Sequence, residues 1–369
     1  MVGRKDAQIW TSKVNQAGTP EIALPTASQF IVDSIDDATS FWAKHGGSEH
    51  HLKLGRARII LRLIGSAIGE TVLPTLRHAL ADPDAASDAV IYAIDSQNTG
   101  FAGPPQDWPF ETLSDQGRQR VHWTGPDGLA LSSDESRGIW HLYDGAKQTG
   151  LYWIRAAQDL PFWEAASPLR HHIHWVSLQK DQGMLHAAVI AKGEAGAMLV
   201  GRGGSGKSTM TAAAMRQGWR STGDDFVLVT NQPEPVSYPL YDMIKLSGMA
   251  ENMFAEITAS ALNPQRRSDE KMLARMSDHA NGAFVEALPI KAAFALTLTG
   301  KPQSRIGRTS SFQIVSAVAA SSSVILRTGL KETFAFTSDM VRKLPCFRFE
   351  VGNDPLEALD VLDNFMGEI

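Results

Sequence analysis

The chain has 369 residues, of which 43% are apolar and 20% charged, so collagen-like, coiled-coil and wholly disordered classes are excluded. The length predicts two domains. Its 40 acidic and 35 basic side chains give a formal charge of −5, which does not favour a nucleic-acid partner.

The single cysteine, Cys346, rules out an internal disulfide and a cysteine-rich zinc site. The first residues carry charges but no apolar stretch of the kind that a secretory signal needs. No segment approaches the roughly 18 uninterrupted apolar residues of a membrane span. We therefore expect a cytoplasmic protein without a membrane or nucleic-acid partner.

The first part of the chain is expected to form a flexible tail over residues 1–22 and a β-rich α+β domain over residues 23–165. Apolar spacing and turn residues place its elements. In chain order we expect a helix from Gln29 to the Gly46-Gly47 pair, a strand over residues 52–65, a helix over 70–81, a strand over 89–94 and short antiparallel strands over 120–153.

The rest of the chain, residues 166–369, changes to the alternation of strands and helices that is typical of an α/β domain. A helix is expected from about Pro168. The apolar stretch from Leu185 to Val200 is broken by polar residues and glycine, and predicts two buried strands joined by a turn.

A glycine-rich loop directly follows the second of these strands. It contains Gly201-x4-Gly206-Lys207-Ser208, the P-loop pattern, and the helix-forming run 209–216 comes next. In such a loop, backbone N–H groups and the helix N-terminus face phosphate oxygens, the lysine adds a point charge and the serine hydroxyl ligates Mg²⁺. The predicted nucleotide-binding residues are Gly201, Arg202, Gly203, Gly204, Ser205, Gly206, Lys207, Ser208 and Thr209.

The same glycines also satisfy the dinucleotide pattern G-x-G-x-x-G. Acidic residues follow them at nearly the distance at which that motif places its ribose-binding acid. Two features favour the P-loop. Lys207 and Ser208 serve a triphosphate and its metal but have no role under a pyrophosphate. In addition, the acidic pair precedes the apolar run 226–229, whereas a ribose-binding acid ends its strand.

That acidic pair, Asp224-Asp225, stands at the start of a predicted strand and next to Gly223. In an ordinary P-loop ATPase the metal-supporting acid follows the apolar strand, so the order here is reversed. Two adjacent carboxylates can divide two tasks between them, one supporting Mg²⁺ and the other accepting a proton from a hydroxyl. A turn that caps the strand is the structural alternative.

Together these segments resemble the HPr kinase/phosphorylase family and its stand-alone relatives, the HPr-kinase-like serine kinases, which include lasso-peptide-tailoring kinases. The resemblance rests on Leu185-His186-Ala187-Ala188, on GRGGSGKST from Gly201 and on GWRSTGDDFVLV from Gly218. It covers about residues 168–230. It implies an α/β P-loop kinase core similar to that of phosphoenolpyruvate carboxykinase, preceded by the β-rich domain.

The resemblance also implies roles for individual residues. His186 would lie beside the γ-phosphate and the catalytic acid. The residue pattern alone favours a core histidine on an apolar strand, and the resemblance gives the functional interpretation equal weight. Lys207 and Ser208 would bind phosphates and Mg²⁺, Asp224 would support the metal and Asp225 would be the general base, an assignment that could be swapped. The glycine- and arginine-rich signature of the bifunctional members is missing, so phosphorylase activity is not expected.

We therefore expect an ATP- and Mg²⁺-dependent kinase that phosphorylates a serine hydroxyl of a peptide or small protein. Two alternatives stay open: a kinase for a small-molecule hydroxyl, and a nucleotide-regulated binding module without phosphotransfer. The sequence also leaves open the choice of ATP or GTP and whether the chain forms a homo-oligomer.

Other polar residues give weaker signals. Lys245 and Lys271 could serve a transferring phosphoryl group, but solvated lysines are the commoner case. His171, His172 and His174 lack a nearby carboxylate or cysteine at ligand spacing, which favours a structural role over a metal site. Arg266-Arg267 is predicted to lie in an exposed loop.

Overall fold

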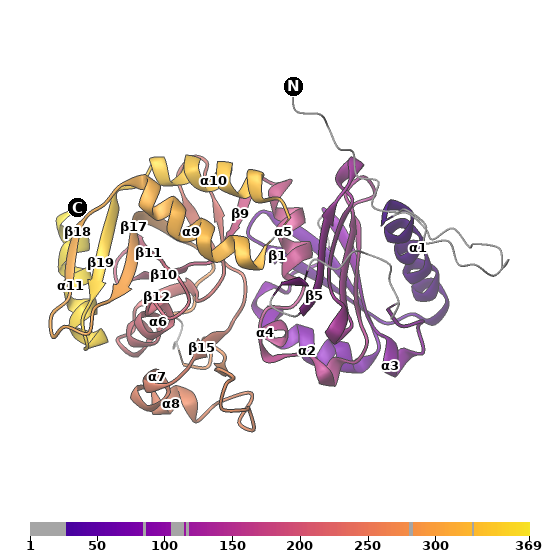
Figure 1. Ribbon diagram of the computed structural model, residues 1–369, viewed down its shortest axis with the longest axis horizontal. Helices are drawn as coiled ribbons and strands as arrows, with labels where there is room; N and C mark the ends of the chain where they lie inside the picture. The colour runs from indigo at the N-terminus through magenta and orange to yellow at the C-terminus, as the bar shows by residue number, and fades with distance from the viewer. Residues whose placement is uncertain (1–26, 84–85, 105–113, 116–117, 280–282, 327) are drawn as a thin grey trace.

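The computed structural model describes residues 27–83, 86–104, 114–115, 118–279, 283–326 and 328–369. The tail predicted over residues 1–22 lies outside these ranges. The described chain is built around two large sheets, which Figure 1 shows side by side with helix α5 between them. This mixed α/β architecture is consistent with the α/β class expected from the sequence, whereas the finer assignment to a P-loop kinase core stays a prediction.

The first sheet has eight strands in the order β1-β2-β3-β8-β7-β6-β5-β4. Strand β3 pairs in parallel with β2 and β8, and the other neighbours are antiparallel. The strands are β1 (Ser48–Leu54), β2 (Ala57–Ile64), β3 (Ala89–Asp95), β4 (Ser114–Asp115), β5 (Arg118–Thr124), β6 (Ala130–Asp134), β7 (Ile139–Asp144) and β8 (Thr149–Ile154). The antiparallel region expected over residues 120–153 is thus confirmed.

The single strand expected over residues 52–65 is wrong, because the chain turns back there and forms the β1–β2 hairpin. Gly55 adopts φ 61°, a conformation that favours glycine, and a Cβ atom at this position would come within 2.2 Å of the Gln182 Oε1 atom. Leu54 consequently pairs with Ala57 across a two-residue turn. The alternation of apolar and polar residues continues across this turn, so the sequence pattern does not reveal it.

Helix α1 (Ala27–His45) covers the outer face of this sheet (Figure 1). Its apolar residues Phe30, Ile31 and Ile35 pack with Trp140 and Leu142 of β7. The helix expected over 70–81 begins earlier and ends earlier, as α2 (Ser66–Leu76), and continues as a 3₁₀ turn. The remaining short helices of this half are η1 (Arg77–Ala79), α3 (Ser96–Thr99), η2 (Pro126–Gly128), η3 (Glu135–Arg137), η4 (Ala157–Asp159) and α4 (Phe162–Ala165).

The second sheet has nine strands, seven of them in the order β12-β10-β11-β17-β14-β13-β9, with β19 beside β17 and β18 beside β19. Strand β17 pairs in parallel with both β11 and β19. The strands are β9 (Gln182–Leu185), β10 (Ala188–Ala191), β11 (Gly196–Val200), β12 (Arg220–Gly223), β13 (Val227–Thr230), β14 (Val236–Pro239), β17 (Leu288–Leu298), β18 (Arg305–Arg308) and β19 (Cys346–Val351).

Helices cover both faces of this sheet. Side chains of α9 and α10 share one buried cluster with β11 and β13, and side chains of α6 and α11 share another with β10, β17 and β19. A small two-stranded antiparallel sheet of β15 (Ile244–Leu246) and β16 (Met272–Ala274) lies beside α6. The helices are α5 (Arg170–Leu178), α6 (Lys207–Arg216), α7 (Met249–Met253), α8 (Ala255–Thr258), α9 (Ser311–Ile325), α10 (Leu330–Arg342) and α11 (Pro355–Glu368).

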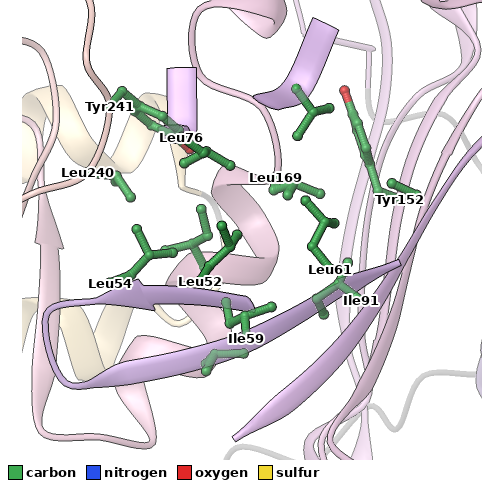
Figure 2. Packing of buried hydrophobic residues seen from close by; sticks show 14 of the residues in the cluster. Leu52, Leu54, Ile59, Leu61, Leu76, Ile91, Tyr152, Leu169, Leu240 and Tyr241 are labelled. Atoms are coloured by element: carbon green, nitrogen blue, oxygen red, sulfur yellow. The ribbon is translucent and has the colours of Figure 1, made fainter. Parts of the chain in front are cut away.

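One hydrophobic cluster joins the two halves of the chain. Figure 2 shows Leu52 and Leu61 of the first sheet close to Leu169, Leu240 and Tyr241 of the second half. The division between residues 165 and 166, directly after α4, stays a prediction. The shared cluster means that the two halves bury apolar surface against each other.

Within the described chain, no helix combines the length and the apolar character needed to cross a membrane.

Candidate active site

The glycine loop connects β11 to α6, as the sequence predicts. Helix α6 begins at Lys207, whose Nζ atom donates to the backbone oxygen of Gly201 at 2.8 Å. The lysine is 6% exposed, and burial lowers its pKa against the attraction of Asp224 and Asp225. The N-terminus of a ten-residue helix and a buried ammonium group therefore face the same loop, an arrangement suited to an anion.

The loop needs glycine where its backbone turns. Gly204 and Gly206 adopt φ values of 80° and 98°, which side-chain-bearing residues rarely take. A Cβ atom on Gly206 would also lie 2.9 Å from the Leu298 Cδ2 atom of β17. Both glycines thus hold the loop in the conformation that exposes its N–H groups.

A cavity of about 440 Å³ opens over this loop. Residues Gly203 to Thr209 line it, whereas Gly201 and Arg202, also predicted to bind nucleotide, do not. The C-terminal part of the chain completes the wall with Gly300, Asn353 and Pro355, which the sequence did not indicate. A cavity of this size lies within the usual range of roughly 300–1,000 Å³ for small-molecule sites.

The acidic pair occupies the turn between β12 and β13. Asp225 has φ 69°, an unusual value for a residue other than glycine, and strain of this kind is concentrated at functional sites. Its Oδ1 atom lies 2.8 Å from the Nε2 atom of His186, and its Oδ2 atom accepts from the Lys245 Nζ atom at 2.6 Å. The turn thus presents Asp225 to two partners from distant parts of the chain.

Burial by itself would raise the pKa of Asp225, but Lys245 and His186 outweigh burial and hold this pKa well below its ordinary range. The carboxylate is therefore ionised at neutral pH. It lines the cavity over the glycine loop, as do His186 and Lys245.

Asp224 is 1% exposed, and neither of its carboxylate oxygens has a hydrogen-bond partner among the described residues. Burial and the adjacent Asp225 raise its pKa, while Ser208, Lys207 and Lys271 act in the opposite direction. A buried carboxylate without a partner is costly unless something compensates its charge. This observation fits a cation held between Asp224 and Ser208.

These residues suit Mg²⁺ bound together with phosphates. Such a site needs only one or two carboxylates, because the phosphates and water supply the other oxygens. No cluster of three His, Cys, Asp or Glu side chains that could hold a metal by itself occurs in the part of the chain that the structure describes. Asp224 and Ser208 would therefore hold the metal only as part of a metal–nucleotide complex.

His186 was expected on the strand before the loop, and this is wrong in detail. It lies in the bend between β9 and β10, where the chain passes from pairing with β13 to pairing with β11. The bend turns its ring toward Asp225 instead of into the sheet. Its role beside the catalytic acid stays a prediction, which this contact supports.

Lys245, the residue for which a solvated role was favoured, is buried. It is 9% exposed on β15, and besides Asp225 it donates to the Ser167 hydroxyl at 3.1 Å. Lys271 lines the same cavity. The sequence signal for Lys245, one lysine in an apolar run, could not distinguish this position from an exposed one.

Two residues of the histidine cluster are structural, as predicted. The ring Nε2 atoms of His172 and His174 lie 3.1 and 3.0 Å from the backbone oxygens of Leu142 and Thr328. His171 differs, because it lines a second cavity that also reaches Asp225.

Comparisons with known proteins do not assign a family. No protein-family model matches the sequence, and no curated protein matches it. Among solved structures, the chain aligns with the HPr(Ser) kinase/phosphatase from Coxiella burnetii at 12% identity and a TM-score of 0.30, over 50% of this chain and 97% of the other. A TM-score this low carries no argument about function, so the proposals below rest on the site itself.

Proposed function

We propose that this protein is an ATP-dependent phosphotransferase that transfers the γ-phosphate to a hydroxyl group. The observation that carries the proposal is the meeting of two features at one cavity: a P-loop with its buried lysine, and an ionised aspartate held between His186 and Lys245. The first feature suits a nucleoside triphosphate and the second suits an acceptor hydroxyl.

In this proposal, Lys207 and the N–H groups of residues 203–209 bind the phosphates, and Ser208 and Asp224 hold Mg²⁺. The metal, when bound, neutralises charge on the phosphates during transfer. Asp225 orients the acceptor hydroxyl and accepts its proton as the oxygen attacks. Its low pKa makes it a weak base, which is sufficient because phosphoryl transfer through a loose transition state depends mainly on positioning and electrostatics.

The acceptor is the second partner of the proposed reaction. A serine of a peptide or small protein is what the family resemblance implies. A small-molecule hydroxyl is favoured by a specific observation, a second and smaller cavity that Asp225 also lines, which is treated in the next subsection.

The experiment that tests the proposed function measures nucleotide binding and γ-phosphate transfer in wild type, Lys207→Ala and Lys192→Ala. Lys192 is a matched control, because its side chain is 60% exposed and pairs with Asp363 away from the loop. We expect Lys207→Ala to lose both activities and Lys192→Ala to keep them. Wild-type protein that binds ATP and a partner but transfers phosphate to nothing would favour the nucleotide-regulated binding module instead.

A further inference from the structure

Asp225 and Lys245 form a wall shared by two cavities. One is the cavity over the glycine loop, and the other, of about 240 Å³, lies on the side of the first sheet. Among the described residues, no other lines both. An acceptor in the second cavity would therefore lie next to Asp225, the proposed base, where that cavity adjoins the one over the phosphate-binding loop.

The second cavity is built mostly by the first sheet and the segment that leaves it. His122, Ser132 and His141 come from β5, β6 and β7, while Trp163 and Glu164 come from α4. Of the residues that line it, only His122, Trp163 and Asp225 are partly exposed, and the others are buried. Most of its wall is consequently made of buried residues.

Its size limits the acceptor. A volume of 240 Å³ falls below the roughly 300–1,000 Å³ of ordinary ligand sites. A serine hydroxyl lies two bonds from its Cα atom, so a polypeptide acceptor would have to bring its backbone close to this small space. The larger cavity between the two halves, of about 860 Å³, is not lined by Asp225 or Lys245.

The charges in the wall are compensated by partners within the protein. Glu164 pairs with Arg170, and Asp134 pairs with Arg137 at 3.0 Å. Lys245 pairs with Asp225. Each of the two permanently charged cations that line the cavity, Arg170 and Lys245, is thus already paired with a carboxylate, so an uncharged acceptor fits better than an anionic one.

The histidines of the wall suit hydroxyl groups. Burial first, and then neighbouring histidines and Arg170, hold the pKa of His141 and of His171 well below the ordinary value, so both rings are neutral. The Ser132 hydroxyl bridges ring nitrogens of His122 and His171 at 3.0 and 3.1 Å. Neutral imidazoles and hydroxyls both donate and accept, which is the pattern that a polyhydroxyl compound also presents.

We infer that the second cavity binds the acceptor, and that the acceptor is a small uncharged compound carrying several hydroxyl groups. The inference rests on the proposed function. In the reaction, the acceptor oxygen forms a bond to the γ-phosphorus and the bond from that phosphorus to the β–γ bridging oxygen breaks. ADP leaves, and the hydroxyl proton passes to Asp225.

The first test incubates the full-length protein with γ-labelled ATP and a cell extract of its source organism, then separates the products by ultrafiltration. We expect the label in a new phosphate ester in the small-molecule filtrate. Label on a retained polypeptide would overturn the inference and leave the proposed function standing. Label transferred to neither fraction by protein that binds ATP would contradict the proposed function itself.

The second test changes the cavity without touching the glycine loop. Ser132→Leu fills it, and we expect transfer to the labelled compound to fall about tenfold or more, with ATP affinity measured separately on the same preparation. Thr124→Leu, an exposed position on β5 outside the cavity, is the matched control. Ser132→Ala keeps the space and should retain more activity than Ser132→Leu, and unchanged ATP affinity of Ser132→Leu excludes misfolding as the cause. Wild-type transfer by Ser132→Leu would overturn the inference.

Discussion

Asp225 is the residue on which the proposed chemistry depends most. In Asp225→Asn the side chain keeps its shape but loses its charge and its ability to accept a proton. We expect phosphate transfer to fall about 10²–10⁴-fold, the usual contribution of a general base, while ATP still binds. The measurement is transfer rate beside nucleotide affinity. A variant that transfers at the wild-type rate would remove Asp225 from the mechanism.

Asp224→Asn is the informative comparison for that experiment. Because Asp224 is buried and has no hydrogen-bond partner among the described residues, its proposed role is to support the metal. The two variants should therefore respond differently to added Mg²⁺. Asp224→Asn should raise the Mg²⁺ concentration needed for transfer, whereas Asp225→Asn should not be rescued by added Mg²⁺.

Lys245 acts on Asp225, and its removal should appear in the pH dependence of the reaction. Lys245 is the largest of the influences that lower the pKa of Asp225. Without it this pKa rises, so the acidic limb of the pH–rate profile of Lys245→Met should move to higher pH. Removing one partner of a buried ion pair also costs about 3–5 kcal/mol of stability, which a denaturant titration can measure. An unshifted acidic limb would show that Lys245 does not tune Asp225.

Among individual residues, the sequence identified those that belong to a local motif. It missed the importance of residues that reach the site through contacts between distant parts of the chain. The spacing around Gly206, Lys207 and Asp225 is local, so it could be read directly. Lys245 and Ser132 reach the site only because β15 and β6 fold against the turn that carries Asp225. No local pattern marks either residue.

The conformation of the glycine loop depends on the backbone angle φ of Gly206. In Gly206→Ala the new side chain would have to adopt φ 98° and would meet Leu298. A left-handed backbone costs about 1–2 kcal/mol for a residue with a Cβ atom, so we expect ATP affinity to fall about tenfold. Isothermal titration measures this change. Gly193→Ala is the control, since a Cβ atom there meets nothing within 4 Å. Equal losses in both variants would contradict the explanation.

Elements with strong periodicity or turn signals were predictable, and those set by long-range packing were not. The β-rich run over residues 120–153 and the strand–loop–helix at residues 196–216 appear as expected. The β1–β2 turn was missed because an alternating pattern does not change when a hairpin reverses the chain within two residues. The bend at His186 was missed for a similar reason, as apolar residues flank it on both sides.

For the whole molecule, buried histidines predict a loss of stability in mild acid. Burial lowers the pKa of His172 and of His174 to about 4, from an ordinary value of 6.5. Below pH 6.5 the unfolded chain takes up protons that the folded chain does not, so stability falls as the pH falls toward 4. The expected loss at pH 5 is about 2 kcal/mol for each histidine.

Denaturant titrations at pH 7 and pH 5 measure this effect. His174→Gln should reduce the difference between the two pH values by about the contribution of one histidine, whatever its effect at pH 7. A wild-type protein equally stable at both values would show that these rings are not buried in the neutral form.

The sequence did not predict how the two halves of the chain pack against each other. A change of composition near residue 165 predicted a division, but only the packing of Leu52 and Leu61 against Leu169 and Tyr241 brings the first sheet up to the turn that carries Asp225. The candidate acceptor cavity exists because of that packing. Neither half of the chain contains it alone.

The wall shared by the two cavities also makes their occupants thermodynamically linked. In the proposed reaction, a γ-phosphate beside Lys245 would compete with Asp225 for its ammonium group, which would leave that carboxylate more available to a hydroxyl group in the second cavity. Linkage is reciprocal, so an acceptor would strengthen ATP binding by the same factor by which ATP strengthens acceptor binding. In the proposed reaction, ADP lacks the γ-phosphate that produces this linkage. The two products therefore no longer strengthen each other's binding, which favours their release.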